Sequence, residues 1–159
     1  MHAARLVTLS PRLQHAAVEL HGYLTYIIVC AVSDRPYTIW GYKGKQVRDQ
    51  IHSRDVARLF VEFYYHPRCG EVYNLGGGRQ NSLSILETID LLANMGFQLK
   101  YDYNPTNRVG DHICYISDLS KLRSHFTQWQ LEYDLPKIVT EIVDRQLYLQ
   151  RAQAKATPA

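Results

Sequence analysis

Residues 37–60, YTIWGYKGKQVRDQIHSRDVARLF, carry the clearest structural pattern of the chain. The β-branched and aromatic residues at 37–40 predict a short strand, and Val47–His52 predicts a second strand after a basic, glycine-punctuated loop. Ser53 is a suitable N-cap, and apolar residues then recur at helical spacing, so we expect a helix that ends before Pro67. The stretch therefore predicts strand, loop, strand and helix in succession.

The alternation of helices and short strands continues in both directions, so the expected fold class is α/β or α+β. Residues 76–78, Gly-Gly-Gly, are expected to form a tight turn, since the chain has neither GxGxxG nor the Lys-Ser/Thr of a P-loop. Residues 1–21 stay unassigned, and the small, polar residues 151–159 are expected to be a disordered tail. Further helices are expected at 22–32, after a cap at Ser82 or Ser84, at 118–126 and at 135–150, and further strands at 71–75 and 99–103.

Composition excludes few functions. The 159 residues are 46% hydrophobic and 21% charged, with a net charge of +3, as expected of an ordinary folded domain. No apolar run is long enough to span a bilayer, so no membrane is expected. The cysteines Cys30, Cys69 and Cys114 form no CxxC, which favours a reduced, cytoplasmic protein. His112 and Cys114 lack a second pair of ligands, so no metal site is expected.

Two short segments carry residues suited to a phosphorylated ligand. Arg48 shares one face of its predicted strand with Gln50 and can present its planar guanidinium to a phosphate. Arg108 and Asp111 lie three residues apart across a glycine, where the arginine suits a phosphate and the carboxylate suits a ribose diol. Two simpler interpretations stay open: Arg48 is a surface arginine paired with a carboxylate, or Asp111 bonds its own backbone in a charged turn.

The order and spacing of these segments resemble a known family. The segments are GYLTYIIVCAV at 22–32, the stretch from 35 to 60, GEVYNLGGG at 70–78, NRVGDH at 107–112 and ISDLSKL at 116–122, followed by Trp129. Over residues 22–150 they resemble the C-terminal half of extended short-chain dehydrogenases/reductases, the NAD-dependent epimerase/dehydratase family. The branch that they resemble most is that of the CDP-tyvelose (CDP-paratose) 2-epimerases.

The resemblance implies a partial Rossmann-like fold and a nucleotide-sugar site. In that site Arg48 and Arg108 would hold the nucleotide diphosphate and Asp111 would accept from the ribose. Residues 37–39 would flank the base, and the helix that starts near Gly22 would line the sugar pocket. Asp55 and Asp118 resemble structural residues of the family and are left out of the site.

The resemblance also implies that NAD and the catalytic residues lie elsewhere. The complete family binds NAD at an N-terminal GxxGxxG turn, which this chain lacks. We also expect the family's Tyr-x-x-x-Lys proton-transfer pair to be absent, so that the chain holds no catalytic residue and no cofactor. The predicted function is therefore that of a truncated nucleotide-sugar epimerase, inactive alone, and the question of enzymatic activity stays open.

Two alternative functions stay open beside this prediction, and the sequence also suggests a ligand and partner chains. The chain could be a binding module or subunit completed by a separate NAD-binding chain, or a basic, tyrosine-rich nucleic-acid-binding protein. The tyrosines do not interleave with a run of Lys or Arg, which disfavours nucleic acid. The expected ligand is a CDP- or UDP-sugar. Without the other half, Val72, Leu75 and the helix face at Ile85, Ile89 and Leu92 would lose their cover, so a homodimer or the missing NAD-binding half is expected there.

Overall fold

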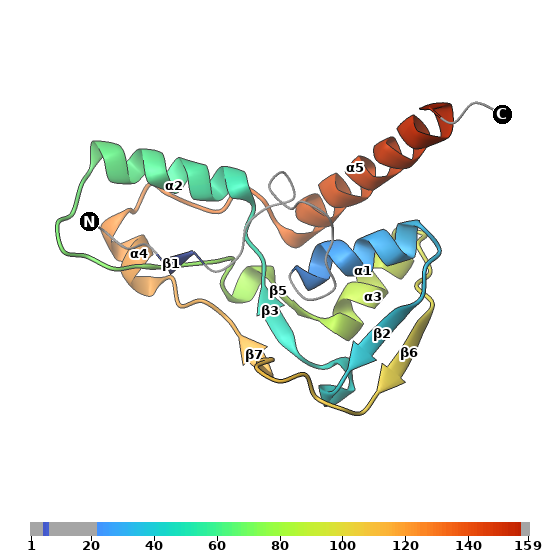
Figure 1. The fold of residues 1–159 in the computed structure, drawn as a ribbon. Helices are drawn as coiled ribbons and strands as arrows, with labels where there is room; N and C mark the ends of the chain where they lie inside the picture. The colour runs from blue at the N-terminus through green and yellow to red at the C-terminus, as the bar shows by residue number, and fades with distance from the viewer. Residues whose placement is uncertain (1–4, 7–21, 157–159) are drawn as a thin grey trace.

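The computed structural model describes residues 5–6 and 22–156 (Figure 1). Helices and short strands alternate, as the sequence predicts. The helices are α1 (Tyr23–Val32), α2 (Ser53–Tyr65), α3 (Ile85–Asn94), α4 (Ser120–His125) and α5 (Leu135–Ala156). The strands are β1 (Arg5–Leu6), β2 (Tyr37–Trp40), β3 (Val47–Asp49), β4 (Asn74–Leu75), β5 (Ser82–Ser84), β6 (Tyr101–Asn104) and β7 (Cys114–Tyr115), with short 3₁₀ turns η1 (Tyr42–Gly44) and η2 (Arg79–Asn81).

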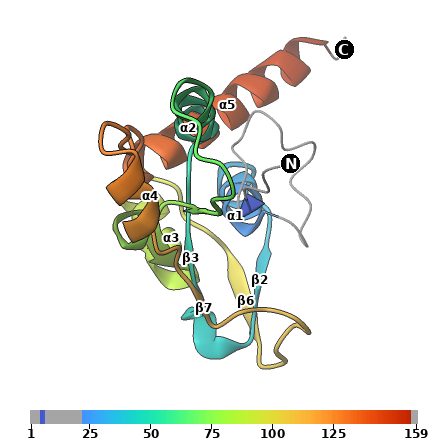
Figure 2. The same cartoon turned by 90° about the vertical axis from the view of Figure 1, so that its left-hand side faces the viewer.

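The strands form small sheets that bring distant segments together. β2 pairs in parallel with β6, and β1 with β4. β3 lies between β5, to which it is antiparallel, and β7, to which it is parallel. In the β3–β7 pair Val47 lies opposite Cys114 and Arg48 opposite Tyr115. This register places the β6–β7 loop beside Arg48, and both views of the fold show β7 alongside β3 (Figures 1 and 2).

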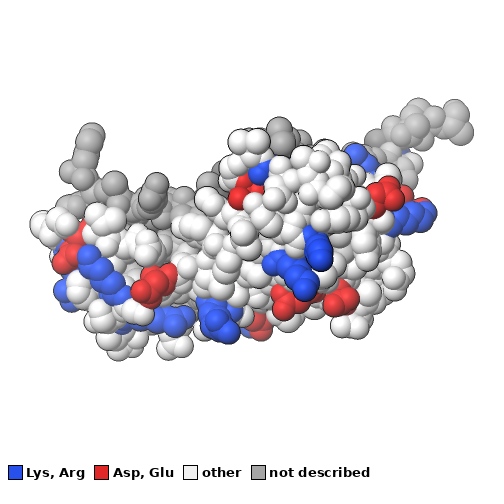
Figure 3. All heavy atoms as spheres, turned by 90° about the horizontal axis from the view of Figure 1, so that it is seen from below, with Lys and Arg blue, Asp and Glu red and all other residues white. Residues whose placement is uncertain are grey.

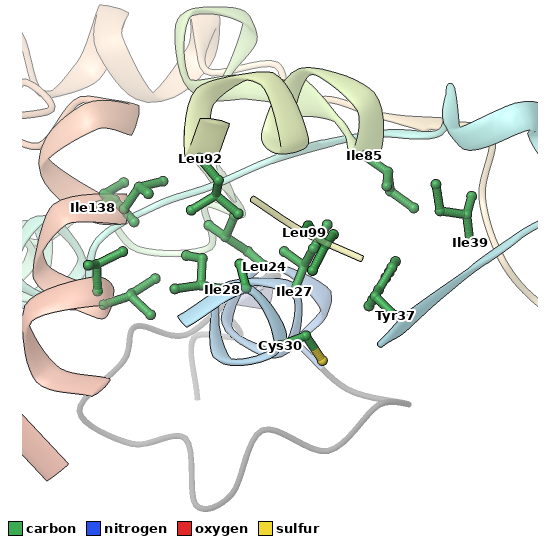
Figure 4. Packing of buried hydrophobic residues seen from close by; sticks show 14 residues of the cluster. Leu24, Ile27, Ile28, Cys30, Tyr37, Ile39, Ile85, Leu92, Leu99 and Ile138 are labelled. Atoms are coloured by element: carbon green, nitrogen blue, oxygen red, sulfur yellow. The ribbon is translucent and has the colours of Figure 1, made fainter. Parts of the chain in front are cut away.

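A first hydrophobic cluster joins α1, β2, α3 and α5 (Figure 4). The sequence of α1, YLTYIIVCAV, is apolar on almost every side, which is typical of a helix buried among neighbours. Ile27, Ile28 and Cys30 are completely buried there. The buried members of the first cluster are Leu24, Ile27, Ile28, Cys30, Ala31, Tyr37, Ile39, Ile85, Leu92, Leu99, Ile138, Val139, Ile142 and Val143.

The first cluster corrects the expectation of an uncovered apolar face. Ile85 and Leu92 of α3 are 5% and 0% exposed because α1 and α5 cover them, and Ile89 packs against the same cluster. Leu75 is 1% exposed, and its strand is paired with Leu6 of β1. Val72 alone in this set is exposed, at 58%. The expectation of an uncovered α3 face is therefore wrong, since elements within this chain supply the cover.

A second hydrophobic cluster packs α2 against α4 and the segment after it. Its buried members are Ile51, Val56, Leu59, Tyr73, Leu75, Leu119, Leu122, Phe126 and Trp129. Helix α2 begins one residue after its N-cap, which is His52 rather than the expected Ser53: the His52 ring accepts from the backbone N–H of Arg54 at 3.1 Å. The imidazole nitrogen thus satisfies one of the donors that a helix start leaves open.

The structural role that the resemblance implies for Asp55 fits its surroundings. Its side chain is fully buried and accepts from the backbone N–H groups of Glu132 and Tyr133, at 3.1 and 3.2 Å, and from Arg58 at 3.2 Å. The indole N–H of Trp129 donates to the Asp55 carbonyl at 3.0 Å. One carboxylate therefore ties the start of α2 to the segment that leads into α5.

Asp118 has a smaller role of the same kind. Its exposed carboxylate accepts from the backbone and the hydroxyl of Ser120, at 2.9 and 2.6 Å, at the start of α4. These hydrogen bonds lower the pKa of the Asp118 carboxyl because they stabilise its charged form. The geometry is that of a turn just before α4, whose N-cap is Leu119, so the contacts of Asp118 are structural.

Some predicted boundaries differ from the structure. The strand expected at 71–75 is confined to Asn74–Leu75, and the strand expected at 99–103 runs from Tyr101 to Asn104. Helix α5 continues to Ala156, which corrects the expected disordered tail over 151–156. That stretch, RAQAKA, consists of strong helix formers and contains neither glycine nor proline, so a helix already started continues through it. Residues 157–159 lie outside the described part.

Ser84, one of the two predicted caps, begins α3. Its hydroxyl accepts from the Glu87 N–H at 3.2 Å, and the Glu87 carboxylate accepts from the Ser84 N–H at 2.6 Å, which forms a capping box. The hydrogen bonds from Ser84 lower the pKa of the Glu87 carboxyl. Because Glu87 is exposed, most of the stabilisation that this capping box gives to α3 comes from the Ser84 cap itself.

Ser84→Ala is expected to lower the free energy of unfolding by about 1 kcal/mol, because the Glu87 N–H loses its acceptor. Ser82→Ala is the matched control, since the Ser82 hydroxyl donates to the Arg79 carbonyl at 2.8 Å and caps no α-helix. Urea denaturation of the two variants measures the difference. An equal loss in both would contradict the assignment of the cap to Ser84.

Candidate functional site

Arg48 and Asp111, both predicted from sequence, form an ion pair. One guanidinium nitrogen of Arg48 donates to the Asp111 carboxylate, and the other donates to the Val47 carbonyl at 2.7 Å. Their side chains are 19% and 25% exposed, so the pair is partly withdrawn from water. Arg48 is thus paired with a carboxylate, as the simpler interpretation has it. The carboxylate, however, belongs to Asp111, 63 residues away, which is itself a predicted ligand-binding residue.

Arg108 reaches the same place from the β6–β7 loop. Its guanidinium lies over the ring of Trp40, 5.4 Å from the ring centroid. A turn closed by the Asp111 N–H and the Arg108 carbonyl, at 3.2 Å, carries both residues, and Gly110 within it has a φ of 79°. Gly41 at the end of β2 also has a positive φ, and a Cβ there would overlap Asn107. The loop therefore packs closely on the β2 end.

These side chains line one open hollow of about 370 Å³. Arg48, Arg108 and Asp111 are all in its wall, so the structure brings together the three residues that sequence analysis singled out. Of the segment expected to flank a base, Tyr37 lines the hollow, whereas Ile39 is buried in the first cluster. The full lining is Tyr23, Tyr37, Trp40, Gln46, Arg48, Ile85, Arg108 and Asp111.

Several residues of this wall were not predicted from the sequence. Gln46 lies two residues before Arg48 and could have been found from the alternation that already paired Arg48 with Gln50. Gln50 lies behind the wall, where its amide donates to the Tyr23 hydroxyl at 3.4 Å. Trp40 and Ile85 carry no sequence signal of this role, since an aromatic or aliphatic residue in such a position is equally suited to a core.

Tyr23 supplies a neutral polar group to the hollow. Burial raises the pKa of its phenol, so the hydroxyl stays protonated at neutral pH. It donates to the Leu83 carbonyl at 3.4 Å. The wall therefore combines two fixed cations, one carboxylate, one neutral phenol and aromatic faces. This set suits a ligand that has phosphates at one end, hydroxyl groups in the middle and a flat ring.

Charges on the underside of the molecule are mixed. Figure 3 shows basic side chains interspersed with acidic ones over this face rather than gathered in one continuous patch. A nucleic-acid-binding surface needs an extended basic track. On this face no such track is visible.

One expectation about the catalytic pair is wrong. A Tyr-x-x-x-Lys spacing does occur, at Tyr133 and Lys137. Tyr133 precedes α5, and its ring stacks on His52 with a centroid distance of 3.8 Å. The Lys137 ammonium donates to the Glu132 carbonyl at 3.2 Å. Both residues have structural contacts, so the spacing alone does not make a proton-transfer pair.

Tyr133 and Lys137 line a second, more open hollow of about 930 Å³. It shares no lining residue with the first hollow, so this pair does not face the arginines of the candidate site. The second hollow is lined by Arg54, Glu132, Tyr133, Pro136, Lys137, Thr140 and Glu141.

The described residues contain neither a metal-binding cluster nor a membrane-spanning helix. Across residues 5–6 and 22–156, no three His, Cys, Asp or Glu side chains are grouped so as to hold a metal ion. None of the helices described combines the length and the apolar character that crossing a lipid bilayer requires. Cys30, Cys69 and Cys114 form no disulfide, and Cys30 is buried.

The sequence of this chain is similar to those of known epimerases. The model of the NAD dependent epimerase/dehydratase family matches residues 6–76, so the similarity begins within the segment that sequence analysis left unassigned. The chain is 33% identical over 92 residues to the CDP-paratose 2-epimerase of Salmonella typhi. That match covers 56% of this chain and 27% of the relative, so the chain spans about a quarter of that protein's length.

Solved structures extend the similarity to most of the fold. The UDP-glucuronic acid 4-epimerase of Bacillus cereus is similar at a TM-score of 0.73 and 25% identity, over 89% of this chain and 43% of that one. The UDP-glucose 4-epimerase of Stenotrophomonas maltophila gives 0.72 and 25%, over 88% and 43%. The predicted Rossmann-like α/β fold of an extended short-chain dehydrogenase, present here in part, is thus confirmed. The predicted resemblance to the NAD-dependent epimerase/dehydratase family, including its CDP-paratose 2-epimerase branch, is confirmed with it.

Proposed function

We propose that residues 22–150 are the substrate-binding part of an NAD-dependent nucleotide-sugar epimerase and bind a CDP- or UDP-sugar in the 370 Å³ hollow. The observation that carries the proposal is the convergence of Arg48, Arg108 and Asp111, from β3 and the β6–β7 loop, beside aromatic rings. The similar B. cereus structure holds a UDP-sugar and NAD, which supports this ligand class.

The chemistry of the wall supports the assignment of each group. Arginine forks bind phosphate oxygens with charge-assisted hydrogen bonds, and Arg48 and Arg108 would hold the diphosphate in this way. A carboxylate accepts from hydroxyl groups, and Asp111 would accept from the ribose. Because Arg48 is paired with Asp111, an entering diphosphate must replace this carboxylate as the partner of Arg48.

NAD and the proton-transfer residues would come from another part of the enzyme, since residues 1–159 contain no GxxGxxG and Tyr133 and Lys137 lie in the other hollow. NAD supplies the hydride acceptor of the reaction. The hollow would hold and orient the sugar nucleotide but would not turn it over alone. We also propose a cytoplasmic location, which the three cysteines support because none of them forms a disulfide.

Arg48→Ala and Arg108→Ala are each expected to reduce binding of CDP and UDP at least tenfold, because a hydrogen bond to a charged group contributes about 1.5–3 kcal/mol. Titration calorimetry on the purified chain measures this. Arg35→Ala is the matched control, since Arg35 is exposed and lies outside the hollow.

The same titrations test whether the chain binds the nucleotide without binding NAD and without turning over the sugar. NAD alone is expected to produce no heat of binding, and CDP-sugars are expected to be returned unchanged after incubation. Unaltered nucleotide binding by the Arg48→Ala, Arg108→Ala double variant would mean that the nucleotide lies elsewhere. Turnover of a nucleotide sugar by the purified chain would overturn the proposal that it lacks the catalytic groups.

Asp111→Asn is expected to distinguish two effects of Asp111, its ion pair with Arg48 and its proposed contact with the ribose. Without the competing carboxylate, Arg48 is free for phosphate, so affinity for pyrophosphate should rise about threefold or more. Affinity for CDP should rise less or fall, because an amide accepts from ribose hydroxyls more weakly than a carboxylate does. Calorimetry with both ligands measures the ratio. Asp102→Asn, at an exposed position of β6, is the charge-matched control. An unchanged ratio would remove Asp111 from the ribose site.

A further inference from the structure

The carboxylate of Asp49 is buried, although it follows Arg48 directly in the chain. Asp49 is 2% exposed and is not among the residues that line the hollow. Since side chains alternate along a strand, it lies on the face of β3 opposite to that of Arg48. A carboxylate is costly to remove from water unless strong hydrogen bonds replace its hydration. The partners of Asp49 therefore show what this residue holds together.

The Asp49 carboxylate joins two separate segments to β3. Its Oδ2 accepts from the backbone N–H of Gly78 at 2.8 Å and from the backbone N–H of Ser117 at 3.1 Å. Gly78 is the last residue of the glycine turn at 76–78, and Ser117 lies two residues after the end of β7. Hydrogen bonds to a charged acceptor are about twice as strong as neutral ones, so both segments are held firmly.

The glycine turn lies close against this carboxylate. A Cβ at Gly76 would overlap both the Asp49 Oδ2 and the Ser117 hydroxyl. A side chain at position 76 would therefore push the turn away from β3 and from the segment after β7. Glycine at this position lets the backbone approach, so that one oxygen of Asp49 reaches both N–H groups.

Strand β7 needs such an anchor because it is short. It consists of Cys114–Tyr115, so its pairing with β3 supplies few hydrogen bonds of its own. Cys114 is exposed and Tyr115 is half-buried, so burial specifies the register of this pair only weakly. The hydrogen bond between Asp49 and Ser117 lies just beyond the pair and adds a charged contact that opposes a slip.

We propose that Asp49 is a positioning residue of the nucleotide site. It holds β7 in register with β3, and this register places the β6–β7 loop, with Arg108 and Asp111, beside Arg48. The proposal rests on the function proposed above, since Asp49 acts on the ligand only through that loop. Arg48 is also held from the other side, because β3 pairs with β5. Loss of the Asp49 charge should therefore misplace Arg108 more than Arg48.

Asp49→Asn tests this proposal in double-mutant cycles. The amide has nearly the size of the carboxylate but lacks its charge, so the two backbone contacts weaken. CDP affinity, measured by NMR titration of the whole chain, should fall about three- to tenfold. In the Asp49→Asn background, Arg108→Ala should reduce the affinity by less than about threefold further, whereas Arg48→Ala should keep its tenfold effect.

This pattern distinguishes positioning of the loop from a general loosening of the chain. Undiminished effects of both arginine substitutions in the Asp49→Asn background would overturn the proposal, because Asp49 would then act independently of the loop. Equally diminished effects would overturn it too, since the whole hollow would then be disturbed. Unchanged CDP affinity in Asp49→Asn has the same meaning. If Arg48→Ala alone leaves CDP binding unaltered, the proposed function itself fails.

Amide hydrogen exchange of the unmodified chain supplies a measurement that needs no variant. Saturating CDP should slow exchange of the Ser117 amide about threefold or more, because breaking its bond to Asp49 releases the loop and with it the ligand. The Glu132 amide is the matched reference, since it donates to another buried carboxylate, that of Asp55, at 3.1 Å. Its exchange should not change. No slowing at Ser117, or equal slowing at both amides, would overturn the proposal.

Discussion

Asp55→Ala is expected to lower the free energy of unfolding by about 3–5 kcal/mol, a large part of the stability of a domain of this size. The substitution removes the acceptor of two backbone N–H groups, those of Glu132 and Tyr133, and leaves Arg58 without its buried partner. Each buried donor left unpaired costs about 1–3 kcal/mol. Denaturant unfolding followed by circular dichroism measures the loss.

Two comparisons make the Asp55 result specific. Asp55→Asn preserves the size of the side chain but replaces one carboxylate oxygen by a donor that faces N–H groups, so it should cost nearly as much as alanine. Lys100→Ala removes one partner of an exposed ion pair, Lys100–Asp34, and should cost less than about 1 kcal/mol. A mild effect of Asp55→Ala would show that the 132–133 segment is held mainly by the packing of Trp129.

Gly77→Ala is expected to cost at least about 3 kcal/mol, because overpacking against rigid atoms forces the backbone to move. A Cβ at Gly77 would overlap the Gln50 carbonyl and lie 2.6 Å from the Cβ of Asn81. Gln50 follows β3 directly, so the displacement would reach the strand that carries Arg48. We therefore expect weaker nucleotide binding as well, measured by the same calorimetry.

Gly70→Ala is the control for this clash. Gly70 has a φ of 76°, and a Cβ there would meet no atom within 4 Å, so the substitution adds backbone strain of about 1–2 kcal/mol without overlap. Thermal melting of the two variants compares strain alone with overlap. Similar melting temperatures would mean that the glycine turn can shift at low cost.

Much of the fold follows from local patterns. The apolar run at 23–32, the strand at 37–40 and the helix after residue 52 lie where the sequence predicts them, because each buries a continuous apolar face. The turn at residues 76–78 is also as predicted. The expectation of an uncovered α3 and Leu75 failed because their cover comes from elements distant in sequence, and no local pattern records that contact.

The candidate site was predicted only in part for the same reason. Arg48, Arg108 and Asp111 are recognisable because charged residues beside glycine in strands and turns suit a phosphorylated ligand. Their pairing across 63 residues follows from the β3–β7 register, which sequence alone does not give.

The separation of the two hydrophobic clusters divides the chain energetically. They share no residue, and Asp55 and Trp129 link the second cluster to the segment that leads into α5. The lining of the candidate hollow comes from α1, β2, α3, β3 and the β6–β7 loop, so neither α2 nor α4 contributes to it. Amide hydrogens of α2 and α4 can therefore exchange through a partial opening that leaves the hollow intact. We therefore expect the second cluster to open independently of the walls of the hollow.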